Sequence, residues 1–168
     1  MQSEKNEICP GCGGVFPSLV GPTHRYMTSS ASCWDRYGKI LAREYSEPTL
    51  FTTHRLSVDT YAVQHPGDGS RQAIQSVGLH LARLMVQLEN QFLPHEANEV
   101  MLRMGVHKTA LPLLVPPESY EMTVADLPVD GNTEGHIIAV RVWAQCTWKA
   151  WTTHHNFISQ WVKTTLGK

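Results

Sequence analysis

The segment from residue 70 to residue 92, SRQAIQSVGLHLARLMVQLENQF, places its apolar residues three and four positions apart. In an α-helix this spacing puts them on one face, ready to pack against other elements. The stripe consists of Ile74, Val77, Leu81, Leu84, Met85 and Leu88. Pro94 ends the helix because proline cannot continue the hydrogen-bonding pattern. A chain with such a helix needs partner helices or a sheet to cover the stripe.

Other segments supply partner helices. After serines that can cap a helix, residues 34–45 carry apolar side chains at helical spacing. A second helix is predicted from residue 49 to residue 65, where Pro66-Gly67 ends it. Residues 133–165 are predicted to form one long C-terminal helix, because Val140, Trp143 and Trp151 share a face. The fold class expected is therefore mainly α, an irregular helical bundle.

The remaining segments read as loops. Residues 8–33 begin with ICPGCGG and lack helical periodicity, so we expect them to form a cysteine-bearing loop ahead of the helices of residues 34–93. Residues 94–132 are a proline-rich connection, in which HEANEVMLRMG is compatible with a short helix. The chain of 168 residues, 42 % of them apolar, is long enough for one domain with a core. We expect residues 1–168 to form a single domain.

Charge and hydropathy exclude several partners. The net charge of −1 gives no reason to expect binding to a nucleic-acid backbone. No apolar run approaches the 18 residues of a membrane-spanning helix, and residues 1–7 are too polar for a secretory signal. We therefore expect a cytoplasmic protein whose four cysteines are reduced. The protein partners are unknown from sequence, and a homo-oligomer remains open.

Cys9 and Cys12 form a Cys-x-x-Cys pair, for which we consider three functions: a redox pair, a haem attachment site and part of a zinc site. A redox pair normally opens a helix after a strand, but here Gly13 and Gly14 follow it. A haem attachment site needs histidine directly after the second cysteine, where this chain has Gly13. A zinc knuckle remains, in which two thiolates bind one tetrahedral ion. The alternative is a loop with free thiols.

A closed zinc site needs two more ligands. Cys33 is the natural third, since it lies at the start of a predicted helix whose dipole favours a thiolate. His24 is the candidate for the fourth ligand. Cys146 lies far along the last helix and is interpreted as a core residue. The sequence thus predicts zinc on Cys9, Cys12, His24 and Cys33.

Interior histidines suggest a second site. In the segment HRLSVDTYAVQHPG, His54 and His65 fall on one helix face. His80 borders the apolar stripe of the next helix, and His154 lies on the inner face of the last. Their imidazoles could converge in the bundle core with Asp59 as a ligand or an orienting group. The alternative is that each histidine is bonded separately to a nearby polar group.

Several phrases resemble a known family in order along the chain. They are CPGCG, GPTH, SCWDRYGKILAREYSEP, HRLSVDTYAVQHPG, QSVGLHLARL and WAQCTWKAWTTHHNFISQW. They resemble an uncharacterised bacterial family that is catalogued as a domain of unknown function. A much looser similarity is to the DinB-like metal-dependent bundles, which implies three histidines on neighbouring helices. This chain has adjacent His154 and His155 where that pattern has His-x-x-x-His.

Three function classes follow. The first is a small helical protein that binds zinc and whose biochemical role is unknown. The second is a metal-dependent hydrolase or thiol transferase that uses the interior histidines. The third is a module that binds a small ligand in an aromatic pocket, because four of the five tryptophans lie in residues 143–161. Phosphate-loop, nucleophile-elbow and HExxH motifs are missing from the sequence, so it gives no support to the corresponding enzymes.

Overall fold

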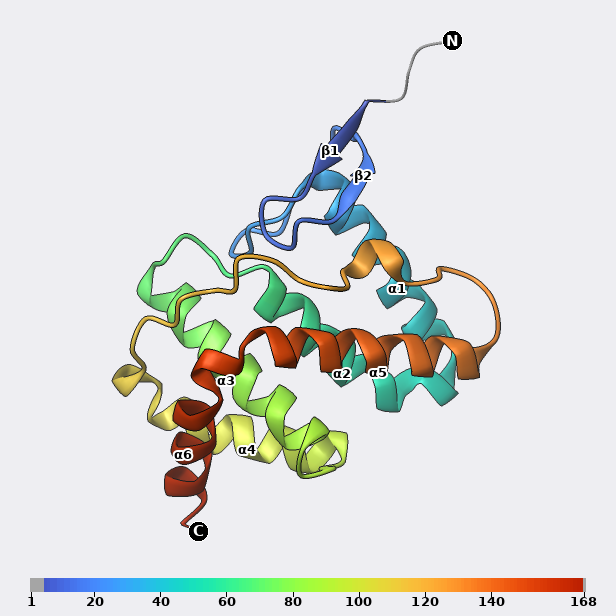
Figure 1. The fold of residues 1–168 in the computed structure, drawn as a ribbon. Helices are drawn as coiled ribbons and strands as arrows, with labels where there is room; N and C mark the ends of the chain where they lie inside the picture. Colours follow the sequence, from blue (N-terminus) through green and yellow to red (C-terminus); the bar gives the residue numbers. More distant parts are fainter. Residues whose placement is uncertain (1–4, 168) are drawn as a thin grey trace.

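The computed structural model describes residues 5–167 and has six α-helices behind a short N-terminal hairpin (Figure 1). The strands of the hairpin are β1 (Asn6–Ile8) and β2 (Val15–Pro17). The helices are α1 (Ala31–Ser46), α2 (Phe51–Gln64), α3 (Arg71–Leu88), α4 (Pro94–Val106), α5 (Thr133–Ala150) and α6 (His155–Leu166). Short 3-10 turns lie at residues 48–50, 108–110, 124–126 and 152–154. The predicted mainly α fold with a cysteine-bearing loop before the helices is confirmed.

Polar side chains mark the starts of the helices. The Ser30 hydroxyl accepts a hydrogen bond from the Cys33 amide at the start of α1, and the Ser70 hydroxyl caps α3 in the same way. Asn132 caps α5 through the Gly135 amide. These contacts satisfy amides that have no partner inside the helix. Helices α1, α3 and α5 therefore begin where the sequence offers a capping residue.

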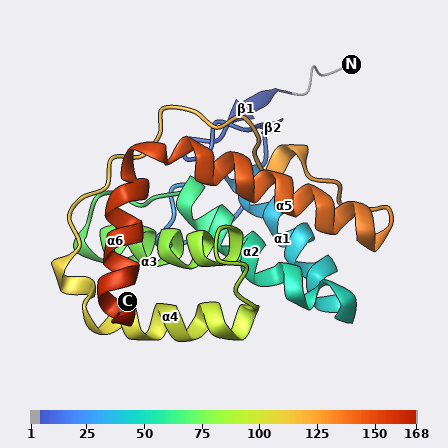
Figure 2. The ribbon, with the colours of Figure 1, turned by 60° about the horizontal axis from the view of Figure 1, so that its bottom comes forward.

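Helix α3 lies at the centre of the bundle. It packs against α2, α4, α5 and α6, and Figure 2 shows it running between α5 and α4. Leu81 and Leu84 of its apolar stripe are fully buried, and Trp143 of α5 lies in the same core. The sequence pattern that predicted this helix therefore corresponds to the central packing surface of the molecule.

The C-terminal segment forms two helices where the sequence predicts one. α5 ends at Ala150, and α6 begins at His155 and turns away from it (Figure 1). The His155 imidazole bonds to the Trp148 carbonyl at 2.7 Å and stacks on the Trp148 ring. The Thr152 hydroxyl donates a hydrogen bond to the Lys149 carbonyl. Because side chains occupy these carbonyls, the backbone amides of the next turn do not continue α5.

The connection between α4 and α5 is ordered by contacts with distant helices. Gln64 at the end of α2 donates to the Met122 carbonyl at 2.8 Å, and the Tyr120 hydroxyl donates to the Val63 carbonyl. Arg36 of α1 donates to the Leu127 carbonyl. α4 occupies the first part of the predicted connection, where the sequence allows a short helix. The proline-rich part of the connection that follows α4 therefore crosses α1 and α2 and is held in place by these hydrogen bonds.

Within residues 5–167, every helix is too short or too polar to cross a membrane.

Candidate metal centre

The hairpin turn presents two sulfurs on the same side of the chain. Ile8 pairs with Val15, and the turn between them closes through hydrogen bonds from the Cys9 amide to the Gly14 carbonyl and from the Gly13 amide to the Cys9 carbonyl. Gly13 has a φ of 76°, a left-handed conformation that glycine adopts without strain. The Gly14 amide lies 3.4 Å from Cys12 Sγ and points toward it. The turn therefore has the form of a metal-binding knuckle.

The third sulfur comes from the first turn of α1. Ser32 lies next to Cys33, and its hydroxyl is 2.6 Å from both Glu7 Oε1 in β1 and the Pro17 carbonyl in β2. These contacts hold the start of α1 against the hairpin. As a result Cys33 is fully buried, and its Sγ lies 3.8 Å from Cys12 Sγ.

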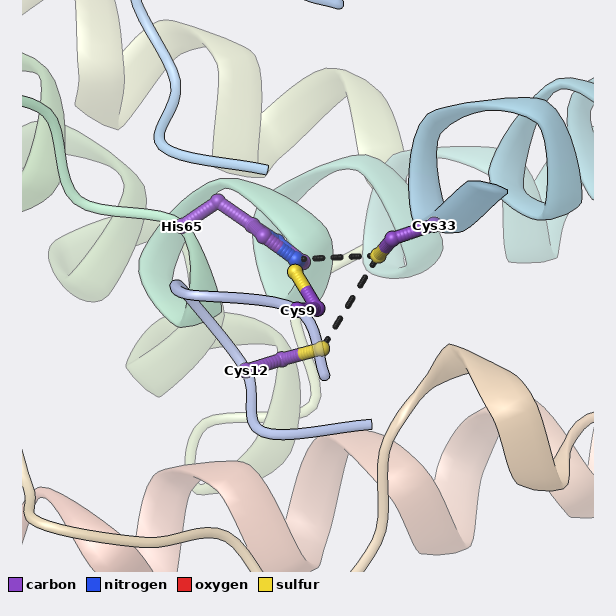
Figure 3. A group of neighbouring side chains, drawn as sticks. All are labelled: Cys9, Cys12, Cys33 and His65. Carbon is purple, nitrogen blue, oxygen red and sulfur yellow. Dashed lines mark hydrogen bonds between the residues drawn. The ribbon is translucent and has the colours of Figure 1, made fainter. Parts of the chain in front are cut away.

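His65 supplies the fourth donor from the end of α2. Its backbone has left the helix, and its Nδ1 donates to the Tyr61 carbonyl at 2.7 Å. That carbonyl lies in the last turn of the helix, where main-chain acceptors lack helical partners. The contact fixes the tautomer, so Nε2 keeps its lone pair. Nε2 points to the sulfurs and lies 3.2 Å from Cys33 Sγ (Figure 3).

Cys9, Cys12, Cys33 and His65 form what we call the cysteine–histidine group. One donor atom from each lies within 4.8 Å of the other three, and all four side chains are buried (Figure 3). With a metal–sulfur bond of about 2.3 Å, a tetrahedral ion sets two sulfurs about 3.8 Å apart. The observed distance between Cys12 and Cys33 matches that edge. The arrangement is able to hold one metal ion.

The thiols shift one another's ionisation. Hydrogen bonds from Cys12 and Cys33 lower the pKa of Cys9 far below its ordinary value. Although contact with Cys33 favours the Cys12 thiolate, contact with Cys9 and burial raise the pKa of Cys12 to about 12. Contacts with Cys12 and Cys9 raise the pKa of Cys33 well above its usual range. One thiolate is therefore favoured without a cation, and three thiolates require a positive charge among them.

The structure brings together three of the four residues predicted for the zinc site. His24 is outside the group: its ring packs on Trp34, and its Nδ1 accepts a hydrogen bond from the Tyr26 amide. His65, which the sequence assigned to a second site, takes that place. The Pro66-Gly67 pair could have identified His65 as a ligand from the sequence, because it ends the helix directly after His65. Ser30 places Cys33 at a helix start in a corresponding way.

The other interior histidines lie apart. His80 Nδ1 is 2.7 Å from Asp59 Oδ1, and that buried carboxylate also binds Arg83. His154 Nε2 contacts the Val115 carbonyl. In the part of the chain that the structure describes, the cysteine–histidine group is the one cluster of three or more donors suited to a metal ion. Of the residues predicted for the second site, Asp59 and His80 contact each other, but His54, His65 and His154 bond to other groups, so the five do not converge on one site.

Three residues of a second buried polar cluster, Glu44, Ser57 and His136, were missed from the sequence. Glu44 is fully buried and joins three helices, since its carboxylate contacts His54 and Ser57 of α2 and His136 of α5. Glu44 lies on the helix face that also carries Tyr37 and Ile40, a position where the sequence pattern gives no reason to expect a charge. The cluster links α1, α2 and α5 in the bundle core.

The tryptophans of the C-terminal segment mainly fill space in the core, whereas Trp34 lines a surface hollow beside the start of α1. Trp143 and Trp151 are buried in the core, and Trp148 donates to Glu89. A hollow of about 210 Å³ lies beside the start of α3, and aliphatic residues such as Ile74, Leu114 and Pro116 line it. The aromatic residues of α5 therefore act mainly in packing.

Comparison with known proteins identifies the family. Residues 7–152 match the model of a family of unknown function, DUF5946. The chain belongs to this family. The match includes all but the first residue of the hairpin, all four members of the cysteine–histidine group and α1 to α5. The same comparisons found no matching curated protein and no matching solved structure.

Proposed function

We propose that this DUF5946 protein binds one zinc ion through Cys9, Cys12, Cys33 and His65, and that the ion has a structural role. The observation that carries the proposal is the convergence of four buried donor atoms from three separate segments. Three thiolates and one neutral imidazole are a common ligand set for structural zinc. Burying these polar groups without a shared partner would be costly, which favours an ion at their centre.

The distances favour a single ion over a larger metal cluster. In an iron–sulfur cluster the cysteines bind different iron atoms, so their sulfurs lie farther apart than on one ion. The distance of 3.8 Å between Cys12 and Cys33, with His65 Nε2 3.2 Å from Cys33 Sγ, fits neighbouring positions of one tetrahedron. Zinc is the metal that soft thiolate ligands and tetrahedral geometry select most often.

The closed surroundings favour a structural role over a catalytic one. A catalytic zinc keeps one coordination position for water or substrate, whereas a structural zinc has four protein ligands. Here four protein donors are available, and each side chain is at most 3 % exposed. The ion would join the hairpin to the start of α1 and the end of α2. Its binding energy would then contribute to folding of the N-terminal part.

Metal analysis of the purified protein tests the proposal. We expect about one zinc per chain in the wild type and none in the double variant Cys9→Ser/Cys12→Ser. The matched control is Cys146→Ser, because Cys146 lies in α5 outside the group. The control should keep its zinc. Stoichiometric zinc in the double variant, or none in the wild type, would overturn the proposal.

Zinc thiolates also bear on location. The ligand set requires reduced cysteines, and a reducing compartment such as the cytoplasm maintains them. We therefore include cytoplasmic localisation in the proposal. Imaging of a tagged protein tests it, and accumulation in an oxidising compartment would contradict it.

A further inference from the structure

Tyr61 lies between two of the proposed zinc ligands. It is in α2, one helical turn before His65, and is fully buried. Its ring stacks on the His65 imidazole, with the ring centres 3.9 Å apart and the planes inclined by 25°. On its other face it stacks on Tyr37 at 3.8 Å. The aromatic ring therefore has little freedom to move.

Two polar groups of Tyr61 contact the two ligands. Its main-chain carbonyl accepts the hydrogen bond from His65 Nδ1, which aims Nε2 at the sulfurs. Its hydroxyl lies 3.5 Å from Cys33 Sγ. A phenol is protonated at neutral pH and a zinc-bound thiolate is an acceptor, so the hydroxyl is the donor in this pair. One residue thus contacts two ligands from two elements.

Such contacts matter because of the charge on the site. Three thiolates, one neutral imidazole and Zn²⁺ carry a net charge of −1 in a buried position, which hydrogen-bond donors to sulfur stabilise. The Gly14 amide serves Cys12 in this way, and the Tyr61 hydroxyl serves Cys33. Groups that orient metal ligands typically change metal affinity by roughly 10- to 100-fold.

We propose that Tyr61 is a positioning residue of the zinc site, whose hydroxyl donates to the Cys33 thiolate and strengthens metal retention. The inference rests on the proposed zinc binding and deepens it. The proposal assigns the effect on the metal to the hydroxyl and not to the ring, because the ring fills the space and the hydroxyl contributes little to packing. Removing the hydroxyl alone should therefore change the metal site and leave the fold intact.

The test compares Tyr61→Phe with Tyr37→Phe. Tyr37 is the matched control because it is also buried and stacked. Within residues 5–167, the hydrogen bonds to the four donor atoms do not include one from the Tyr37 hydroxyl. Zinc affinity is measured by competition with a chromophoric chelator. The thiolate-to-metal absorption band is measured on the cobalt(II)-loaded proteins. Tyr61→Phe should bind zinc roughly 10- to 100-fold more weakly and shift the cobalt band.

The control should match the wild type in both readouts. Equal affinity and an unshifted band in Tyr61→Phe would overturn the role of the hydroxyl while leaving zinc binding intact. Equal losses in both variants would assign the effect to packing and overturn it as well. If the wild type binds neither zinc nor cobalt, the proposed function itself fails.

A measurement on the wild type removes any dependence on the folding of a variant. In the protein loaded with cadmium-113, a hydrogen bond to a metal-bound sulfur couples the donor proton to the metal nucleus. We expect a correlation between the Tyr61 hydroxyl proton and cadmium in the NMR spectrum. A fully loaded protein in which the hydroxyl proton is observed without that correlation would overturn the proposal.

Discussion

His65 Nε2 lies 3.2 Å from Cys33 Sγ, although 32 residues separate them along the chain. The contact joins the end of α2 to the start of α1. At these two positions the chain offers complementary groups, because Cys33 lies at a helix N-terminus that favours a thiolate and His65 satisfies a carbonyl at a helix C-terminus. The cysteine–histidine group is thus formed by the ends of two packed helices that meet the hairpin.

Replacement of His65 should weaken zinc binding far more than replacement of His24. His65→Ala removes a buried donor from the group, whereas His24→Ala removes a ring that packs on Trp34. Zinc content and chelator competition check this, with an expected loss of stoichiometric zinc in His65→Ala only. A protein that loses its zinc with His24→Ala and keeps it with His65→Ala would restore His24 as the fourth ligand.

Gly11→Ala should disrupt the knuckle. A Cβ at Gly11 would lie 2.1 Å from the Thr28 carbonyl oxygen and 2.6 Å from His65 Cδ2, so the turn must move away from His65. We expect weaker zinc binding and a lower melting temperature, measured by competition and thermal unfolding. The matched control is Gly38→Ala in α1, where a Cβ meets open space and helix propensity favours alanine by about 1 kcal/mol. Unchanged zinc affinity in Gly11→Ala would contradict the packing of this turn on His65.

Asp59→Asn should destabilise the bundle and flatten its response to acid. Burial raises the pKa of Asp59, but hydrogen bonding from His80 and the charge of Arg83 outweigh it and hold the pKa below the ordinary value. A lowered folded-state pKa gives stability that is present above the unfolded value near 3.9 and is lost as pH falls below it. Breaking a buried pair costs about 3–5 kcal/mol. Denaturant unfolding at neutral and acid pH measures both effects.

The control for this prediction is Asp35→Asn. Asp35 pairs with Lys39 on the exposed surface of α1, and such pairs are worth about 0–1 kcal/mol. Its unfolding free energy should stay close to that of the wild type. Equal losses of unfolding free energy in the two aspartate variants would show that the buried Asp59–Arg83 pair stabilises the fold no more than an exposed pair does.

Leu81→Ala should cost about 2–5 kcal/mol of unfolding free energy, because the side chain is fully buried in α3 and its loss leaves a cavity. Leu102→Ala is the control, since Leu102 of α4 is 74 % exposed. Urea unfolding should separate the two variants by more than about 1.5 kcal/mol. A loss below about 1 kcal/mol for Leu81→Ala would contradict the central position of α3.

Much of the fold follows from local patterns that the sequence displays directly. The apolar stripe of residues 74–88 predicts α3, and Pro48 and Pro66 lie just after the ends of α1 and α2. The sequence predicts that Pro94 ends the next helix, but α3 already ends at Leu88 and Pro94 begins α4. The break between α5 and α6 was missed because no proline or glycine marks it. There His155 and Thr152 occupy carbonyls of the previous turn, and side-chain hydrogen bonds of this kind leave the apolar periodicity unchanged.

The sequence by itself determined helices α1 to α3, the Cys9–Cys12 knuckle and the candidacy of Cys33 at a helix start, because each depends on neighbours within a few residues. Only the tertiary structure decided which histidine joins the sulfurs and which histidines pair with buried carboxylates. His24 is nearer to the cysteines along the chain, but packing of α2 against α1 carries His65 to them. Such packing depends on the summed fit of many side chains across the core, and the spacing of ligands along the chain does not contain it.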